Sequence, residues 1–322
     1  MSERAGGAVS ERVRPRRLRR GDTVAVVAPS GPVDPGRLAA GCAVLRDLGL
    51  DVVVGRHVFA RVDLAEAEPV RPGWQALAGT DADRAADLRE AWCDPAVRAV
   101  LCARGGYGAT RVLDHLDWAA LAAATAAHGP KILHGSSDIT ALHVAFGYRL
   151  GITTSFGPMV ASLLADAGRE PVTAAHARAA LFGRGEPVRG RRALVGGRAE
   201  GPLTGGNLSL LAALTGTGHA AEPATGRLAF IEDVTEEPYR IDRMLGQLLQ
   251  AGWFAGVAGI ALGSWVDCGD PAELDAVFLD RLGPLGVPLL AGLPIGHGSP
   301  QLTIELGAGT CLDADQKLLT PV

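Results

Sequence analysis

The sequence has few cysteines, few aromatic residues, no long apolar run and no excess of charge of one sign. Its five cysteines include no C-x-x-C pair, and their odd number argues against both a disulfide framework and a zinc cluster. Every apolar run falls short of the roughly 18 residues that span a bilayer. We therefore expect a protein of the reducing cytoplasm that is not embedded in a membrane.

The balance of charge also excludes one class of partner. Thirty-one basic residues stand against 35 acidic ones, so the net charge is −4, which argues against nucleic acid as a ligand. A basic run at 14–20 and an apolar run at 23–28 superficially resemble an export signal. The apolar run stops after six residues at Pro-Ser-Gly-Pro, whereas a signal needs about 7–15. We therefore expect no cleaved leader.

The length of 322 residues predicts about two domains, at roughly 150 residues each. In the first half, short β-branched runs alternate with Ala-rich and Leu-rich stretches of helical period, which is typical of β-α units and a parallel sheet. The predicted strands are 23–28, 51–54, 99–102 and 131–133, and the predicted helices are 35–48, 81–92 and 111–127. In such a sheet, ligands bind at the carboxyl ends of the strands.

The second half is more strand-rich. Strands are predicted at 227–231, 257–262, 287–290 and 302–306, and a helix at 240–251. Residues 183–203 are rich in glycine and arginine and have no sustained period, so they predict a linker or an edge hairpin. We expect an α/β protein with an N-terminal flavodoxin-like or Rossmann-like parallel sheet with flanking helices and a C-terminal mixed α/β domain. The expected segments are 1–20 (basic, possible disorder), 21–182, 183–203 (linker) and 204–322.

The most informative segment is a predicted strand, turn and helix around Gly135-Ser136-Ser137-Asp138. A serine at such a turn can be exposed above a sheet as a nucleophile, where backbone N–H groups stabilise an oxyanion. Serine and aspartate are also preferred helix N-caps. From this segment alone both interpretations stay open.

A nucleophilic serine needs a base and an acid to orient it. Among the eight histidines, His297 stands out because it lies in a glycine-bracketed turn after an apolar strand. Glu232 and Asp233 end another apolar strand. Because side chains alternate in direction along a strand, one of the two would face the crevice. The chain order of serine, acid and histidine is that of α/β-hydrolases, although order alone decides nothing.

A glycine-rich loop at 104–108 (RGGYG) follows the third predicted strand. Two glycines let backbone N–H groups approach a ligand. A dinucleotide loop is disfavoured because Arg111 stands where a third glycine belongs. An oxyanion-binding role beside the serine turn fits the same crevice.

Taken together, five motifs in register resemble the LD-carboxypeptidase family of serine peptidases, which also includes microcin-C immunity proteins. The first strand, 21–31 (GDTVAVVAPSG), is similar as well, so the resemblance covers about residues 20 to 315. The motifs are RGGYG at 104–108, G-x-S-D-I-T at 135–140, GGNL at 205–208, E-D-V-x-E-x-P-Y-R at 232–240 and G-H at 296–297.

The resemblance implies a cytoplasmic enzyme without metal or other cofactor, commonly a homodimer, that removes terminal D-alanine from muropeptide tetrapeptides in cell-wall recycling. By position, Ser137 is the implied nucleophile, Glu232 the acid and His297 the base. The implied oxyanion donors are the backbone N–H of Asp138 and that of Gly105 or Gly106. Arg104, Arg240 and Arg243 are candidates for holding the substrate carboxylate, with surface salt bridges an equal alternative for each.

Two other functions stay open. An immunity-type amidase that cleaves a peptidyl-nucleotide or aminoacyl-nucleotide toxin would need an aromatic platform for the base, and only 5% of the residues are aromatic. Trp253, Phe254 and Trp265 are the candidates. A small-molecule binding protein without catalysis is the third possibility, because a fold does not guarantee a function.

Overall fold

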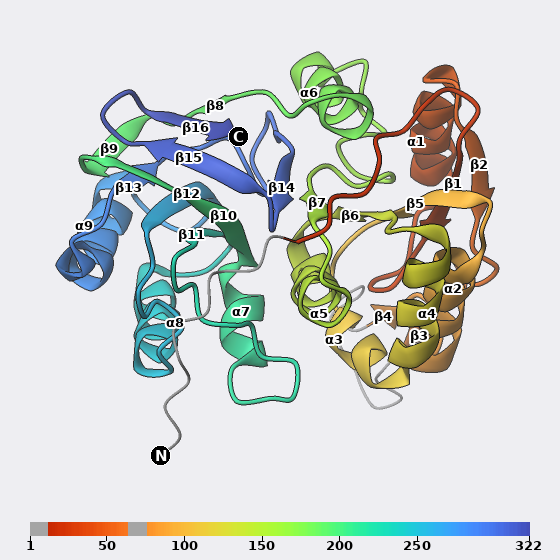
Figure 1. Cartoon of the computed structure of the whole chain (residues 1–322), viewed down its shortest axis with the longest axis horizontal. Helices are drawn as coiled ribbons and strands as arrows, with labels where there is room; N and C mark the ends of the chain where they lie inside the picture. Colours follow the sequence, from red (N-terminus) through yellow and green to blue (C-terminus); the bar gives the residue numbers. More distant parts are fainter. Residues whose placement is uncertain (1–11, 64–75) are drawn as a thin grey trace.

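Two twisted sheets organise the chain, one in each half of the molecule, and they lie side by side (Figure 1). The computed structural model describes residues 12–63 and 76–322. The fold class expected from the sequence is confirmed: the first half is a mostly parallel sheet between helices, and the second is a mixed α/β unit.

The N-terminal sheet has the strand order β14-β7-β6-β5-β1-β2, in which only β14 runs antiparallel to its neighbour. Its strands are β1 (Thr23–Val27), β2 (Asp51–Val54), β5 (Val97–Cys102), β6 (Ile132–Gly135), β7 (Thr154–Phe156) and β14 (Ile304–Leu306). A separate two-stranded ribbon is formed by β3 (Val62–Asp63) and β4 (Ala76–Leu77). The four strands predicted for this half are confirmed as β1, β2, β5 and β6.

Helices cover both faces of this sheet. One face packs against α1 (Pro35–Asp47) and α6 (Pro171–Phe182). The other packs against α2 (Asp81–Cys93), α3 (Ala109–Val112), α4 (Trp118–His128) and α5 (Thr140–Leu150). The single helix predicted at 111–127 is wrong: α3 and a 3₁₀ turn, η1 (Leu113–His115), precede α4. The break follows from Asp117, whose carboxylate accepts from the N–H of Ala120 and so starts a new helix.

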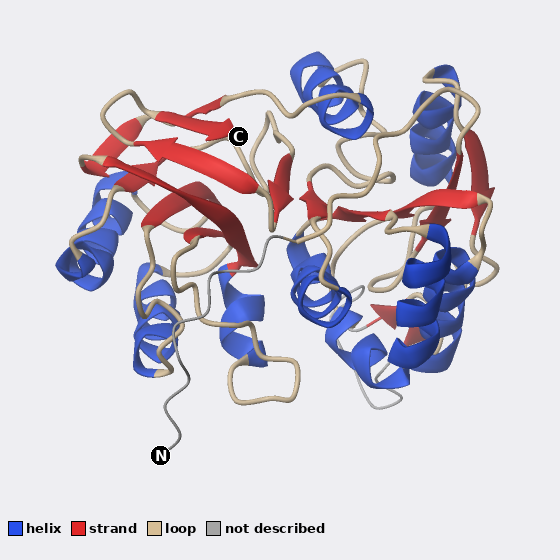
Figure 2. Ribbon diagram, viewed as in Figure 1, coloured by secondary structure: helices blue, strands red, loops and turns tan. Residues whose placement is uncertain are grey.

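The C-terminal sheet has the order β8-β16-β15-β10-β11-β12-β13-β9, and β10 to β13 run parallel. Helices α7, α8 and α9 gather on one side of it (Figure 2). Its strands are β8 (Val188–Arg189), β9 (Arg192–Val195), β10 (Arg198–Asn207), β11 (Leu228–Val234), β12 (Gly259–Val266), β13 (Leu289–Ala291), β15 (Gly309–Asp313) and β16 (Leu318–Pro321). The helices are α7 (Leu208–Leu214), α8 (Pro238–Gln250) and α9 (Pro271–Leu282), followed by the 3₁₀ turn η3 (Gly283–Leu285).

Segment 183–203 was expected to be a linker or an edge hairpin. It is not a plain linker, because β8 and β9 are the two edge strands of the second sheet, although they pair with β16 and β13 and not with each other. The segment contains β8, β9 and the first half of β10, all of which join the eight-stranded sheet. The pieces of two to four residues between glycines are too short to show a period, and β9 is a largely exposed edge strand. The predicted strand at 302–306 forms as β14, but it pairs with β7 in the N-terminal sheet, so the two halves interlock.

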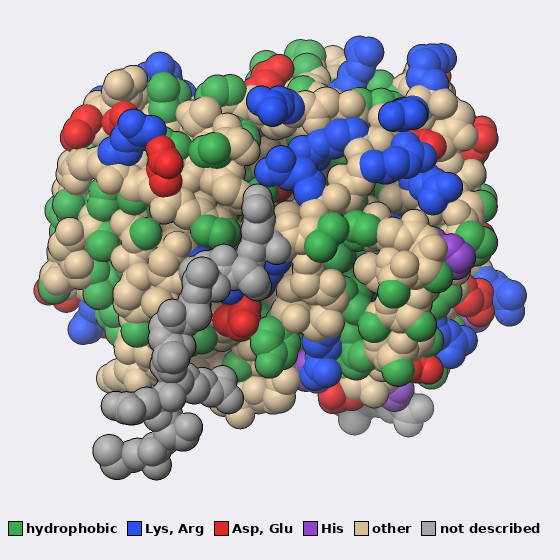
Figure 3. Space-filling model, viewed as in Figure 1, with side chains coloured by type: hydrophobic (Ala, Val, Ile, Leu, Met, Phe, Trp, Pro, Cys, Tyr) green, Lys and Arg blue, Asp and Glu red, His purple; other side chains and the backbone are tan. Residues whose placement is uncertain are grey.

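Two further contacts join the halves. Phe156 of β7 meets Phe230 of β11 edge to face, with ring centroids 5.2 Å apart, inside a core shared by both sheets. The segment before β1 also crosses the molecule: Arg12 pairs with Glu222 at 3.3 Å, and Arg17 forms two bonds to Glu305 at 2.7 and 2.9 Å. Basic side chains gather over this region (Figure 3). Of the expected basic segment 1–20, residues 1–11 lie outside the described chain.

Candidate active site

Ser137 lies on a sharp turn between β6 and α5. It is half-buried and is the first residue of the 3₁₀ turn η2 (Ser137–Ile139). Its φ is +60°, a conformation that costs a residue with a side chain about 1–2 kcal/mol. Backbone strain of this kind is concentrated at functional sites. Neither η2 nor α5 has a side-chain N-cap hydrogen bond, so the capping interpretation of this motif is wrong.

Asp138 joins the loops behind this turn. Its buried carboxylate accepts from Ser30 Oγ at 2.6 Å and from the N–H of Ala109 at 2.7 Å. Ser30 follows β1 and Ala109 follows β5, so three loops at the carboxyl ends of neighbouring strands are held together. Burial raises the pKa of Asp138, and the two hydrogen bonds oppose that shift.

Gly105 lies directly against Ser137. A Cβ atom at position 105 would be 2.9 Å from Ser137 Cβ, 3.1 Å from Ser137 Oγ and 3.4 Å from the N of Asp138. The Gly105 carbonyl accepts from the N–H of Gly31 at 3.2 Å. In a trans peptide the next N–H points the opposite way, so the N–H of Gly106 faces away from Gly31. A side chain at position 105 would therefore crowd Ser137 Oγ.

Glu232 and His297 form the second half of the site. Glu232 lies near the end of β11 and is fully buried, and its Oε2 lies 2.7 Å from Nδ1 of His297. A Cβ at Gly296 would be 2.3 Å from that Oε2, so only glycine permits this approach. Burial disfavours the imidazolium of His297, but the hydrogen bond and charge of Glu232 outweigh it and raise the pKa of His297.

The structure separates the roles of Glu232 and Asp233. The Asp233 carboxylate accepts from Asn207 Nδ2 at 2.8 Å and from the N–H of Ser209 at 2.8 Å, so it lies at the start of α7. Asn207 Nδ2 also lies 3.4 Å from Glu232 Oε1. Asn207 is therefore a site residue that reasoning from spacing did not identify, although it belongs to the GGNL motif.

Two hydrogen bonds fasten the halves of the site to each other. Gln301 Nε2 donates to Ser136 Oγ at 3.1 Å, and the N–H of Asn207 donates to Thr140 Oγ1 at 2.9 Å. The turn at 136–140 is thus held on both sides by the C-terminal half. Over residues 12–63 and 76–322, no hydrogen bond joins Ser137 to His297. Catalytic contacts are often longer before a substrate binds.

The three candidate arginines differ in their surroundings. Arg104 is exposed beside Gly105, and its Nη1 donates to the carbonyl of Pro32 at 3.0 Å. Arg240 of α8 pairs at 2.8 Å with Glu236, which lies just before the helix, and the Arg243 guanidinium lies 5.4 Å from the ring centre of Tyr239. Arg104 is thus the candidate on a loop of the site, whereas the other two make local contacts on a helix surface.

Other histidines near the turn have core roles. His134 bonds Ser155 Oγ and the Pro158 carbonyl, each at 2.8 Å, and burial lowers the pKa of His134 to about 4. Within the described ranges, no cluster of three or more His, Cys, Asp or Glu side chains could hold a metal ion. Likewise, none of the helices described is both long and apolar enough to cross a membrane.

Comparison with known proteins identifies relatives along nearly the whole chain. A family model described as the LD-carboxypeptidase N-terminal domain matches residues 24–157, and its C-terminal counterpart matches residues 200–312. A Streptomyces coelicolor protein, named only provisionally as a carboxypeptidase, is 52% identical over 314 residues, which cover 96% of each chain. The murein tetrapeptide carboxypeptidase of Pseudomonas aeruginosa is 33% identical over 310 residues, covering 91% of this chain and 94% of that protein.

A solved structure shares the fold. The microcin C7 self-immunity protein in complex with aspartyl sulfamoyl adenosine superposes with a TM-score of 0.81 at 23% identity, covering 96% of this chain and 98% of the other. At that identity the likeness concerns the fold alone.

Proposed function

The chain belongs to the LD-carboxypeptidase family of serine peptidases, and we propose that it hydrolyses an LD-peptide bond and releases terminal D-alanine from muropeptide tetrapeptides. The observation that carries the proposal is the 2.7 Å contact between Glu232 and His297. An acid that holds a half-exposed imidazole in one orientation is the arrangement that activates a serine.

In the proposed reaction, Ser137 Oγ attacks the scissile carbonyl while Nε2 of His297 takes its proton. Glu232 accepts a hydrogen bond from the Nδ1–H of His297, which fixes the tautomer and stabilises the imidazolium. His297 then protonates the leaving amine, D-alanine departs, and the rest of the peptide stays on Ser137 as an ester. Water, deprotonated by His297, hydrolyses the ester and restores the enzyme.

The developing oxyanion is bound by backbone N–H groups in this proposal. Asp138 supplies one, because its N lies next to the position that a Cβ of Gly105 would fill. Gly106 supplies the other. The Gly105 carbonyl is bonded to Gly31, so the N–H of Gly106, which points the opposite way in the same peptide, faces away from Gly31. Losing one such donor typically costs about 10²–10³ in rate.

Arg104 is the proposed partner of the substrate's terminal carboxylate. Its exposed guanidinium belongs to the same loop as Gly105, and one of its five donors is already used on the Pro32 carbonyl. The remaining donors suffice for a bidentate contact with a carboxylate. Arg240 and Arg243 stay secondary candidates because each already interacts on α8.

Cleavage of an aminoacyl-nucleotide amide is the alternative, and it uses the same triad. One observation favours it: Tyr107, 49% exposed, follows Gly106 and could stack on a base. Trp253 and Phe254 are buried, so these two of the three aromatic candidates offer no platform. Trp265 is half-buried at a separate cavity.

A direct comparison of substrates tests the proposal. The purified protein is given equal concentrations of the tetrapeptide L-Ala-D-Glu-diaminopimelate-D-Ala, its diastereomer that ends in L-Ala, and aspartyl sulfamoyl adenosine. We expect hydrolysis of the first only, seen by mass spectrometry as free D-alanine. Cleavage of the nucleotide alone would replace the carboxypeptidase proposal with the amidase.

We further propose that the protein acts in the cytoplasm as a homodimer. The five cysteines are all free, which suits a reducing compartment. Sedimentation of the purified protein tests the dimer, and fractionation of cells tests the compartment.

A further inference from the structure

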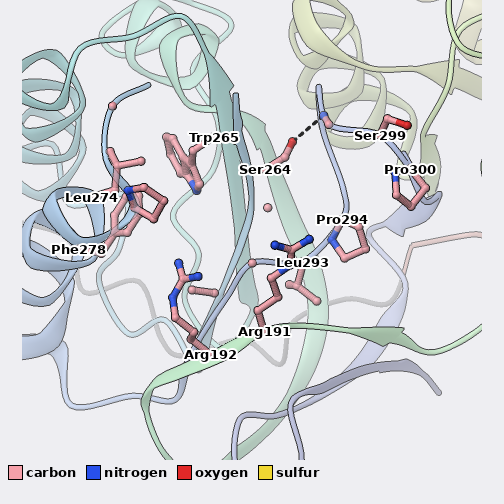
Figure 4. A pocket seen from close by; sticks show the side chains of 16 residues that line it. Arg191, Arg192, Ser264, Trp265, Leu274, Phe278, Leu293, Pro294, Ser299 and Pro300 are labelled. Carbon is pink, nitrogen blue, oxygen red and sulfur yellow. Dashed lines mark hydrogen bonds between the residues drawn. The ribbon is translucent and has the colours of Figure 1, made fainter. Parts of the chain in front are cut away.

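A cavity of about 250 Å³ lies in the C-terminal half, at the carboxyl ends of β12 and β13 (Figure 4). Its lining includes Ser264 and the loop 298–300, but none of Ser137, Glu232 and His297. Ser264 Oγ accepts from the N–H of Gly298 at 3.0 Å, directly after His297. Ligands of parallel sheets bind at this edge, so the position is that of a binding site.

Apolar side chains form two facing walls of the cavity. Trp265 and Phe278 stand on one side, with ring centroids 4.8 Å apart, and Pro294 and Pro300 stand on the other (Figure 4). A cavity of about 150 Å³ is enough to hold benzene. A volume of about 250 Å³ therefore accommodates one aromatic ring with a short polar arm.

Two arginines lie at the same end of the cavity, but only one has a carboxylate partner. Arg192 is held by Asp275, with Nε 2.6 Å from Oδ2 and Nη2 2.9 Å from Oδ1. The side chain of Arg191 packs over Gly292, and within the described chain its guanidinium has no hydrogen bond or ion pair. Figure 4 shows that guanidinium turned toward the cavity. An unpaired cation beside apolar walls selects an anion with an apolar body.

Trp265 adds a second unsatisfied donor. Its Nε1 atom is buried, yet no described residue accepts from it. Buried indole N–H groups usually have a partner, and an unpaired one costs about 1–3 kcal/mol. In Figure 4 the indole nitrogen is on the side of Trp265 that faces the two arginines. A carboxylate placed there could accept from both Arg191 and Trp265.

We propose that this cavity is a binding site for a small carboxylate with a planar apolar body. Arg191 binds the carboxylate, Trp265 donates to it or stacks on the ring, and Phe278 with the two prolines encloses the apolar part. The site is separate from the catalytic residues, so it does not depend on the proposed hydrolysis. A ligand there would touch the loop that follows His297.

The test uses 3-phenylpropionate as the probe and 3-phenylpropanamide as its neutral isostere, titrated by calorimetry into the full-length protein. We expect the acid to bind at least tenfold more tightly than the amide. Arg191→Gln should abolish that preference, so that both probes bind alike. Arg189→Gln, which removes an exposed arginine bonded to the Gln316 carbonyl outside the cavity, is the matched control and should bind as the wild type does.

Several outcomes would overturn the proposal. One is the absence of saturable binding when the acid is titrated up to about 10 mM, a concentration at which even a weak site would bind it. Another is an unchanged preference for the acid in Arg191→Gln. Ser137→Ala should bind the acid normally, and weaker binding there would place the probe in the catalytic site instead. Unchanged affinity for the acid in Trp265→Phe, measured by the same calorimetry, would place the probe elsewhere.

Discussion

Gln301 Nε2 donates a hydrogen bond to Ser136 Oγ across 3.1 Å, and both side chains are buried. Ser136 precedes the proposed nucleophile, and Gln301 lies four residues after the proposed base. This one contact therefore fixes the loop of His297 against the turn of Ser137, although Ser136 and Gln301 are 165 positions apart in the chain. Asn207, bonded to Thr140 and close to Glu232, performs the same task on the other side.

Gln301→Leu should lower both stability and turnover. It leaves the buried Ser136 hydroxyl without its donor, which costs about 1–3 kcal/mol. Because the bond sets the distance between base and nucleophile, we expect kcat to fall more than KM changes. Urea unfolding and steady-state kinetics measure the two effects. Gln316→Leu, at an exposed position, is the control, and equal behaviour of the two variants would refute the role of Gln301.

Glu232→Gln should reduce kcat strongly while the fold is retained. The amide preserves the size of the side chain but lacks the charge that stabilises the imidazolium, and such a change in a serine triad costs about 10⁴-fold. The exposed Glu237, changed to Gln, provides the comparison and should keep wild-type turnover. An active Glu232→Gln enzyme would show that His297 does not depend on this carboxylate.

The pH dependence of kcat/KM should reflect the interaction between Glu232 and His297. His297 must be neutral to accept a proton, so kcat/KM should fall as the pH drops through its pKa, with a midpoint above the usual value of about 6.5. Glu232→Gln should move the midpoint of any residual activity downward.

The stability of the fold should change with pH in the opposite sense. Because the pKa of His297 is raised in the folded protein, protonation of His297 stabilises the folded state. This stabilisation is complete at pH values below the pKa of the unfolded protein, and it is lost as the pH rises through the pKa of the folded protein. Denaturant titrations across the same range measure it. A midpoint at or below about 6.5 in the kinetic profile would contradict the account of the pair.

The two glycines of the RGGYG loop should respond differently to alanine. Gly105→Ala places a methyl group 2.9 Å from Ser137 Cβ, so we expect kcat to fall by about 10² or more. Gly106 has φ +111°, and the nearest atoms to an added Cβ lie 3.5 Å away, so Gly106→Ala should mainly cost stability, about 1–3 kcal/mol. Comparing kcat with thermal midpoints separates the effects. The reverse pattern would be inconsistent with a site at Gly105.

Local patterns in the sequence predicted much of the N-terminal half. The runs of β1, β5 and β6 are apolar and end in turn residues, so their positions and the crevice beyond them follow from short-range chemistry. The same patterns indicated the segments of Ser137, Glu232 and His297 separately. They did not predict which side chains meet, because the contacts of Gln301 and Asn207 join distant parts of the chain.

The sequence left the edges of the second sheet open between a linker and an edge hairpin, and the individual strands could not be predicted for a related reason. Strands β8 and β9 have two and four residues, separated by glycine and arginine, so no alternation can be seen in them. They form because the sheet offers partners, with β16 beside β8 and β13 beside β9. In the same way, nothing local to β14 indicates that it pairs with β7 of the other half.

The identity of the nucleophile is the most direct test of the whole account. D-alanine release from the tetrapeptide would be followed by mass spectrometry for the wild type, Ser137→Ala and Ser136→Ala. We predict that Ser137→Ala releases none, whereas Ser136→Ala, which loses only the bond to Gln301, keeps activity within about tenfold of the wild type. Release by Ser137→Ala, or its loss only in Ser136→Ala, would contradict the proposed mechanism.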